Sequence, residues 1–360
     1  MVVGSVAESL LLKTETSDWL RLKEIFENPA LQMATFTITE KGYQIKNASG
    51  YLPQIKEDMQ VGPEQAKSYM GCLTALCYLR YLAGKLPLAL VSMDNFSHNG
   101  DRLKTAVLTI AEVWEKNNLV EEGFSGYLQD ETKISFPWSM IDKITPRPDS
   151  KIKEMLERTG LEGMDIFTTS ANTYIAPFVN AEETEYLVIE DNFPNGRPKL
   201  EHAGILFADR RTVECVEQMK VCTCLNPLHT GLAIFGCLLS YTSISKEMED
   251  PLLRELAVQI GQEGMPVVVH PGILEPKQFL QEVLCVRLPN PYIPDTPQRI
   301  ATDTSQKISI RYGETIKAYQ KTGKSLKQLR AIPLVIAGWI RYLTGVDDFG
   351  NAMELSRIRV

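Results

Sequence analysis

The sequence predicts two domains of different class, an α/β domain over residues 1–211 and an all-helical domain over residues 212–360. In the first part, apolar runs typical of strands alternate with amphipathic helices, which is the α/β pattern. From Thr212 onward helical periodicity dominates, and no alternating strand run is evident. A chain of 360 residues with 44% hydrophobic and 23% charged residues is ordinary for a globular protein and long enough for two domains.

Each predicted element of the first domain follows from a local pattern. Strands are expected where β-branched and aromatic residues alternate or where a short run is wholly apolar, and helices where apolar residues recur every three or four positions. The expected strands are 1–6, 32–39, 86–93, 186–190 and 204–208, and the expected helices are 18–26, 62–83, 101–117 and 150–159. Pro63 just inside the start and Gly84 just past the end support the helix at 62–83. In the second domain, helices are expected at 212–224, 227–246, 250–261, 275–284, 302–321 and 325–344.

Polar residues follow two of the predicted strands. A loop containing Thr39, Glu40 and Lys41 ends the first of them, and Asp94 and Asn95 end the run 86–93. Ligands of open α/β sheets gather at the carboxyl ends of the strands, so these positions are candidates for ligand contacts. Simple exposed loop charges would give the same pattern.

Composition excludes several classes of partner. The net charge is −7 and no basic tract stands out, which argues against a nucleic-acid partner. The N-terminus lacks the features of a signal peptide, and no run approaches the ~20 apolar residues of a membrane span. The seven cysteines are odd in number and sit mostly in apolar helical runs, as expected for reduced thiols in a cytosolic protein. A zinc site from Cys215, Cys222, Cys224 and His229 stays open as a minor alternative, because the spacing is not that of a zinc knuckle.

The stretch from Lys220 to His229 holds the strongest candidate site. It places Lys220, Asn226 and His229 in an otherwise apolar run, and lysine and asparagine are rarely buried without a partner. On a straight helix Lys220 and His229 would point to opposite faces, so they converge only if the helix breaks between them. Pro227 supplies the expected break, with Asn226 as N-cap and His229 as the third helical residue. Spacing alone favours a structural role, in which Asn226 only caps and His229 packs in the core.

Five ordered motifs resemble those of the mannitol dehydrogenase family, the polyol-specific long-chain dehydrogenases. K-x5-N-x2-H at 220–229 resembles the catalytic motif, and the segments at 37–43, 92–100 and 134–146 resemble family signatures. Arg299 and Lys307, eight residues apart, match a paired basic motif. The resemblance covers almost all of the chain, and within the family it is strongest to the D-mannonate oxidoreductases, also called fructuronate reductases.

The resemblance implies an incomplete Rossmann-like dinucleotide-binding domain followed by a helical substrate domain. It implies an NAD-dependent oxidoreductase, with NADP not excluded, that interconverts D-mannonate and D-fructuronate. Lys220 would be the general acid and base, Asn95 and Asn226 would hold the reacting oxygen, and His229 would bind a substrate hydroxyl. The remaining implied roles are substrate binding by Asp142, Arg299 and Lys307, a proton route at Glu217, and cofactor contacts at Thr39, Glu40, Lys41 and Asp94. A guanidinium such as that of Arg299 suits the carboxylate of a sugar acid.

The chain departs from this family pattern in one respect. It contains no G-x-G-x-x-G turn, which in a dinucleotide fold binds the pyrophosphate. We therefore expect the chain to be the middle of a longer enzyme, lacking segments at both ends. The alternatives are a mannitol or other hexitol 2-dehydrogenase, an inactive fragment without the phosphate loop, and a zinc-binding helical module. The oligomeric state cannot be predicted from the sequence.

Overall fold

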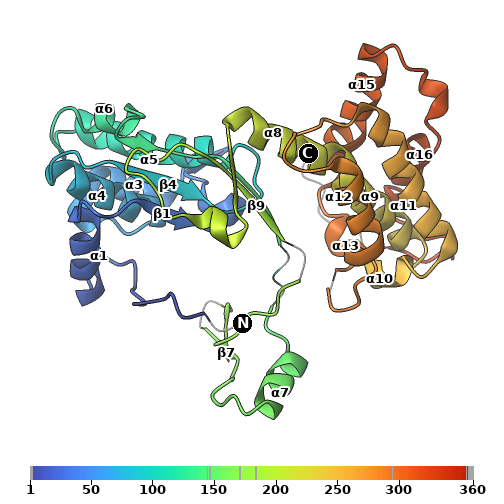
Figure 1. Cartoon of the computed structure of the whole chain (residues 1–360), viewed down its shortest axis with the longest axis horizontal. Helices are drawn as coiled ribbons and strands as arrows, with labels where there is room; N and C mark the ends of the chain where they lie inside the picture. The colour runs from blue at the N-terminus through green and yellow to red at the C-terminus, as the bar shows by residue number, and fades with distance from the viewer. Residues whose placement is uncertain are drawn as a thin grey trace. The chain divides into compact units, whose positions relative to one another are not determined.

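A computed structural model describes residues 3–143, 145, 147–169, 172–182, 185–293, 295–353 and 355. The chain forms two compact units (Figure 1). One contains residues 1–141 and 186–213, and the other contains residues 142–185 and 214–360. The first is α/β and the second is mainly helical, as predicted from the sequence. Residues 142–185, which were predicted to lie in the first domain, belong instead to the second unit.

A parallel sheet lies at the centre of the first unit. Its strands are β1 (Met33–Phe36), β4 (Leu88–Ser92) and β5 (Ile134–Ser135), in the order β1-β4-β5. Every residue of β4 is buried, as expected of a central strand in a parallel sheet. A second three-stranded sheet has the order β10-β9-β6, formed by β10 (Leu206–Ala208), β9 (Tyr186–Glu190) and β6 (Ser139–Asp142). The strand expected at 1–6 is wrong for residues 3–6, which form no regular structure, and residues 1–2 lie outside the described residues.

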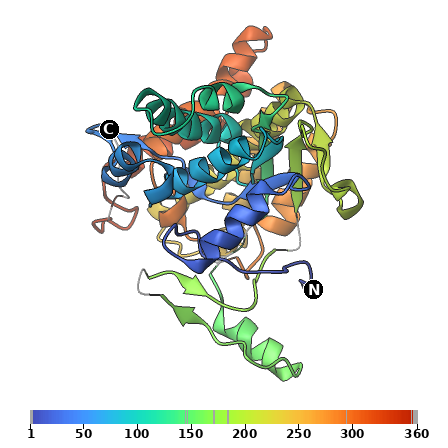
Figure 2. The same cartoon turned by 90° about the vertical axis from the view of Figure 1, so that its left-hand side faces the viewer.

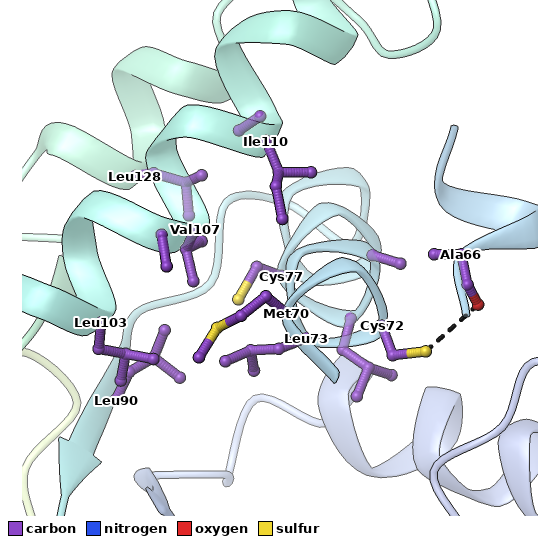
Figure 3. Packing of buried hydrophobic residues seen from close by; sticks show 14 of the residues in the cluster. Ala66, Met70, Cys72, Leu73, Cys77, Leu90, Leu103, Val107, Ile110 and Leu128 are labelled. Carbon is purple, nitrogen blue, oxygen red and sulfur yellow. Dashed lines mark hydrogen bonds between the residues drawn. The ribbon is translucent and has the colours of Figure 1, made fainter. Parts of the chain in front are cut away.

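Helices pack on the β1-β4-β5 sheet and form the main core of this unit. They are α1 (Ser17–Glu27), α3 (Pro53–Val61), α4 (Tyr69–Leu82), α5 (Asn99–Lys116) and α6 (Phe124–Gln129). Figure 3 shows the apolar face of α4 directed at β4 and α5. The buried side chains drawn there include Met70, Leu73, Cys77, Leu90, Leu103, Val107, Ile110 and Leu128. These contacts fix the position of β4, whose carboxyl end carries Asp94 and Asn95.

The helix expected at 62–83 is wrong in its first turns. Gly62 ends the preceding helix α3 with a φ of +81°, a conformation that glycine adopts without strain. Pro63 then opens only a short 3₁₀ turn, and α4 begins after Ser68, whose side chain accepts a hydrogen bond from the Gly71 backbone N–H. The carboxylate of Asp58 fixes the connection, because it accepts hydrogen bonds from the backbone N–H groups of Lys67 (2.7 Å) and Ser68 (2.9 Å).

The second unit consists mainly of helices and contains three π-helical turns among its described residues. Its longer helices are α9 (Asn226–Leu238), α11 (Pro251–Gly264), α12 (Pro276–Glu282), α15 (Glu314–Lys321) and α16 (Ala331–Tyr342). Shorter helices are α10 (Ile244–Glu247), α13 (Pro297–Ile300) and α14 (Thr304–Ile308). The π-helical turns are η3 (Lys220–Cys224), η5 (Val283–Arg287) and η6 (Ser309–Gly313). They interrupt the helices predicted at 212–224, 275–284 and 302–321, which the sequence pattern alone does not distinguish from continuous α-helix.

Residues 142–185 form a separate segment of the second unit. It contains α7 (Ser150–Arg158), close to the predicted bounds, and a hairpin of β7 (Phe167–Thr168) and β8 (Tyr174–Ile175) that was not predicted. Both are coloured light green in Figure 2. Two-residue strands are too short to show an alternating pattern, which explains why the sequence did not reveal the hairpin.

The helical stretch Arg210–Leu238 is long and apolar enough to cross a membrane by length and composition. The sequence prediction found no such run, because charged residues of α8 (Arg210–Met219) interrupt its apolar positions. In the structure 72% of the apolar window is buried within the protein, as in a core helix. All seven cysteines are free thiols.

Candidate active site

Lys220 lies at a break between two helices of the second unit. Helix α8 passes into the π-helical turn η3 at Lys220, and Leu225 then leaves helical geometry with φ −129° and ψ −62°. The predicted break between Lys220 and His229 is therefore confirmed, but its form differs. Leu225 and not Asn226 is the N-cap of α9, one residue earlier than predicted. His229 is consequently the fourth residue of α9.

Lys220 belongs to a network of four buried charged side chains. Lys220 Nζ lies 2.8 Å from Asp142 Oδ1, and the side chains of Lys220 and Asp142 are only 4% and 5% exposed. Arg287 donates to both oxygens of Asp142, with 3.1 Å from Nη2 to Oδ1. The same guanidinium forms two hydrogen bonds with Glu182, at 2.9 and 3.2 Å. Asp142 therefore divides its charge between a lysine and an arginine, and Glu182 balances the second cation.

This network adjusts the proton affinity of both partners. Burial by itself would raise the pKa of Asp142, but the charges of Lys220 and Arg287 outweigh it and hold that pKa below its usual range. Burial lowers the pKa of Lys220; Asp142 opposes this effect, whereas Arg287 adds to it. Lys220 is thus an amine that gives up its proton more readily than an exposed lysine. Such a group can act as a general base or acid.

His229 lies in a positively charged environment. Its Nε2 is 3.3 Å from Asp295 Oδ2, without hydrogen-bond geometry, and has no hydrogen-bond partner among the described residues. Burial lowers the pKa of His229 to about 3, and the nearby charges of Arg311, Arg299, Arg287 and Lys307 act in the same direction. The imidazole is therefore neutral at physiological pH and able to hydrogen-bond a ligand through Nε2.

Arg299 and Lys307 occur close to this histidine but differ in their partners. Arg299 Nη2 forms an ion pair with Asp295 Oδ1, and the side chain is 62% exposed. Lys307 Nζ donates to the backbone carbonyls of Ile300 (3.1 Å) and Thr302 (2.5 Å). Asp295 therefore already occupies part of the Arg299 guanidinium, and substrate binding by Arg299 stays a prediction.

Three charged residues of this region were missed in the sequence. Arg287 and Glu182 complete the Lys220 network, and Arg311 binds Thr230, the residue after His229. An arginine within the apolar run of η5 was a signal for Arg287, because a buried guanidinium needs a partner. The spacing of four residues between Lys307 and Arg311 was a signal for Arg311, because such residues share a helix face. No sequence signal identifies Glu182 as a partner, because it comes from a distant loop.

The other two candidates of the second unit are less constrained. Asn226, the first residue of α9, is partly buried, and its side chain makes no hydrogen bond within the described part of the chain. Glu217 is partly buried in α8, three residues before Lys220. Neither residue is held by the charged network.

The remaining candidates lie in the first unit, at the carboxyl ends of β1 and β4. Residues 39–42 form the short helix α2 (Thr39–Gly42) and not the expected loop, because the backbone is already helical at Ile38. Lys41 and Asn95 are exposed. Asp94 is buried, and its carboxylate accepts hydrogen bonds from the Tyr43 hydroxyl (2.5 Å) and the Phe96 backbone N–H (3.0 Å). The Tyr43–Asp94 hydrogen bond joins the two segments at one edge of the sheet, where ligands of open α/β sheets bind.

No three potential metal ligands come together within the described residues, so the zinc-binding alternative gains no support there. Cys224 Sγ instead lies 3.7 Å from the backbone carbonyl of Pro276. Burial raises the pKa of both Cys222 and Cys224, to about 11 and about 12, which keeps them as thiols.

The chain thus combines a parallel α/β unit with a helical unit that contains a buried lysine–carboxylate–arginine centre. The Rossmann domain model of mannitol dehydrogenase matches residues 2–202, and the model of its C-terminal domain matches residues 212–358. The chain therefore belongs to the mannitol dehydrogenase family. Together these matches extend from residue 2 to residue 358.

Individual relatives agree with this assignment. The chain is 58% identical to a D-mannonate oxidoreductase of Thermotoga maritima over 359 residues, which cover 99% of this chain and 66% of that protein. It is 29% identical to the D-mannonate oxidoreductase of Escherichia coli, covering 98% of this chain and 68% of the relative. The chain thus spans about two thirds of the length of these relatives.

Two solved structures have a similar fold. A substrate-free D-sorbitol dehydrogenase matches with a TM-score of 0.79 and 26% identity, covering 94% of this chain and 65% of that one. A Pseudomonas fluorescens mannitol 2-dehydrogenase, in a ternary complex with NAD and D-mannitol, matches with a TM-score of 0.68 and 28% identity. That match covers 98% of this chain and 67% of the other.

Proposed function

We propose that this protein is an NAD-dependent oxidoreductase that interconverts D-mannonate and D-fructuronate. Family membership and the 58% identity to a D-mannonate oxidoreductase support the reaction class and the substrate. The observation that carries the proposal is the buried Lys220 amine, 2.8 Å from a carboxylate that it shares with Arg287. We further propose that residues 1–211 are the dinucleotide-binding domain and 212–360 the substrate domain.

Lys220 is proposed to move the proton of the reaction. In reduction, Nζ donates a proton to the ketone oxygen as that oxygen gains negative charge, and in oxidation the neutral amine takes the hydroxyl proton. Bound NAD supplies the hydride chemistry. Asp142 orients the amine through the 2.8 Å contact. The charge of Arg287 lowers the pKa of the amine, so the amine gives up its proton more readily. Glu217, three residues before Lys220, is proposed to pass the proton to solvent.

The other side chains bind and orient. The amide groups of Asn95 and Asn226 are proposed to donate hydrogen bonds to the reacting oxygen, a role that stabilises developing charge. Neutral His229 is proposed to accept or donate a hydrogen bond at a substrate hydroxyl through its unpartnered Nε2. Arg299 and Lys307 give the substrate region its positive charge. This charge favours a sugar acid over a neutral polyol.

Thr39, Glu40, Lys41 and Asp94 are proposed to contact the cofactor. They follow β1 and β4 at the sheet edge where dinucleotides bind, and so fit the nicotinamide side of NAD. The 360 residues contain no G-x-G-x-x-G turn to bind the pyrophosphate. The seven free thiols support a cytosolic location.

Hexitol 2-dehydrogenase activity is the second candidate, favoured by the fold match to a mannitol 2-dehydrogenase bound to D-mannitol. The two functions separate in one assay. NADH or NADPH is mixed with D-fructuronate or with D-fructose, and the loss of reduced cofactor is followed by absorbance. We expect the fastest turnover with NADH and D-fructuronate, and turnover slower by about 10²- to 10⁴-fold in the Lys220→Ala variant. Turnover of D-fructose alone would transfer the assignment to the hexitol enzymes.

A further inference from the structure

Two cations beside His229 have no acidic partner within the described residues. Lys307 in α14 and Arg311 in η6 are four residues apart, and both are partly buried. Lys307 Nζ is bound by backbone carbonyls of Ile300 and Thr302, and Arg311 Nη1 donates to the hydroxyl of Thr230. By contrast, Arg287 is bound to Asp142 and Glu182, and Arg299 to Asp295. The positive charge of the Lys307–Arg311 pair is therefore not neutralised by an ion pair.

Such a pair is unfavourable in the absence of an anion. A cation that leaves water loses its hydration and normally gains a carboxylate in return. Burial lowers the pKa of Lys307 to about 8 and that of Arg311 to about 10, and the charge of Arg311 also lowers the pKa of Lys307. Asp303 partly opposes this effect at Lys307 without forming an ion pair with it. An anionic ligand would remove the mutual repulsion.

The fold holds Arg311 in place beside the proposed substrate region. Tyr312, the next residue, is fully buried and donates a 2.6 Å hydrogen bond to the Pro227 carbonyl at the start of α9. Thr315 donates to the Cys222 carbonyl in η3 (3.2 Å). These two bonds tie η6 and the start of α15 to the segments that carry Lys220 and His229. Among the charged residues that lower the pKa of His229, Arg311 has the largest effect.

We propose that Arg311, together with Lys307, forms the subsite that binds the carboxylate of the sugar acid. A guanidinium binds a carboxylate through two parallel N–H···O bonds, and the adjacent ammonium adds a third donor. Arg299, whose guanidinium is already paired with Asp295, adds positive charge near the subsite but does not bind the carboxylate directly. The assignment rests on the proposed function, because it names the residue that makes the enzyme select an acid over a neutral sugar.

The test compares two substrates that differ only in the group to be bound. D-Fructuronate carries a carboxylate where D-fructose has a hydroxymethyl group. Steady-state KM and kcat are measured with NADH for both ketoses in the wild-type enzyme and in Arg311→Met, Arg311→Lys and Arg299→Met. We expect Arg311→Met to raise the ratio of the KM for D-fructuronate to the KM for D-fructose by about 10- to 100-fold, the effect of a lost charged hydrogen bond. Arg311→Lys keeps the charge but loses the parallel N–H donors of the guanidinium, so a smaller rise of this KM ratio is expected.

Two controls separate binding from folding. Arg254→Met, an exposed arginine on α11, should leave both KM values as in the wild type. Arg311→Met should melt at or above the wild-type temperature without ligand, since it removes a cation that no acid balances. A kcat for D-fructuronate that stays near the wild-type value would confirm a binding role.

The possible failures are distinguishable. If the wild type reduces D-fructuronate but Arg311→Met changes both substrates equally, the subsite assignment is wrong and the proposed function stands. If Arg299→Met and not Arg311→Met changes the ratio of the two KM values, Arg299 binds the carboxylate and the assignment is again wrong. If the wild type does not reduce D-fructuronate, the proposed function fails and the subsite falls with it.

Discussion

Lys220 and Arg287 bind the same carboxylate, that of Asp142, from two different π-helical turns. An aspartate that paired with Lys220 alone would stabilise the protonated amine and make it a poor base. Because Arg287 also binds Asp142 and is itself balanced by Glu182, the amine is held in position without being locked in its charged form. Asp142 therefore orients Lys220, while Arg287 keeps the amine from being stabilised only in its protonated form.

The first prediction concerns the amine itself. Lys220→Ala should lower kcat by about 10²- to 10⁴-fold, the usual contribution of a general acid or base. Binding of D-mannonate should be largely retained, because the substrate contacts lie on other residues. The fold should persist, since Arg287 still neutralises Asp142. Steady-state kinetics and calorimetric binding measure the two effects, and partial recovery of turnover by added methylamine would confirm the role. Near-normal kcat in the variant would remove Lys220 from the mechanism.

A second prediction uses the pH dependence of oxidation. Arg287 lowers the pKa of Lys220 more than Glu182 raises it. Removing both in Arg287→Met/Glu182→Gln therefore leaves Lys220 with Asp142 alone and should raise its pKa. The oxidation of D-mannonate needs the neutral amine, so the rise of kcat/KM with pH should move to higher pH.

Glu182→Gln alone is the matched control for this experiment. It removes a carboxylate that raises the pKa of Lys220, so the profile should move in the opposite direction, to lower pH. The double variant also avoids the about 3–5 kcal/mol loss expected when one partner of a buried ion pair is left alone. Profiles that coincide with the wild type in both variants would show that this network does not set the working pH.

The sequence predicted the centre of this site but not its surroundings. Lys220, Asn226 and His229 stand out because polar residues interrupt an apolar run, and Asp142 was found through the family signature. Arg287 and Glu182 lie 67 residues after and 38 residues before Lys220, and only the fold brings them together. The helix break was predicted from Pro227, whereas the π-turn that forms it has no comparable sequence signal. Local patterns report local structure, and ion pairs between distant segments do not appear in them.

π-helical turns explain much of this difference. Within the described residues, η3, η5 and η6 each carry one basic residue of the site, namely Lys220, Arg287 and Arg311. An extra residue in a turn rotates the following side chains relative to a regular α-helix, so faces inferred from a period of 3.6 residues are shifted beyond it. Arg299 and Lys307 were found as a pair through the family motif. Asp295, which binds Arg299, lies four residues before it, a spacing that the sequence analysis did not use.

A third prediction follows from the pKa of Lys307, which burial lowers to about 8 and to which Arg311 and Arg299 also contribute. The protonated amine binds an anion, so the affinity for D-fructuronate should fall as the pH rises through about 8. Lys307→Arg should flatten this dependence, because arginine stays charged. The KM for D-fructuronate, measured from pH 6 to pH 9 (roughly the range around the Lys307 pKa), tests the effect, with D-fructose as the neutral control. A parallel rise in the KM for D-fructose would assign the titration to another group.

The last prediction concerns stability and a carboxyl group away from the charged network. Glu247, the last residue of α10, is fully buried, and neither of its oxygens has a partner within the described residues. It packs against Gly236 of α9, where any side chain would collide with the carboxyl group. Burial raises the pKa of Glu247 to about 9, so the folded protein binds a proton that the unfolded chain releases above about pH 4.5.

The sign of the effect on stability follows from this difference in proton binding. Between about pH 4.5 and pH 9 the folded state holds more protons than the unfolded state, so the contribution of Glu247 becomes less favourable as the pH rises, by up to about 1.4 kcal/mol per unit. Glu247→Gln has the same shape and no charge to lose, and should be more stable than the wild type by on the order of 3 kcal/mol at pH 7. The difference should shrink toward pH 5. Urea unfolding of both proteins over this pH range measures it, and a difference that does not change with pH would mean that Glu247 is charged in the folded protein and has found a partner.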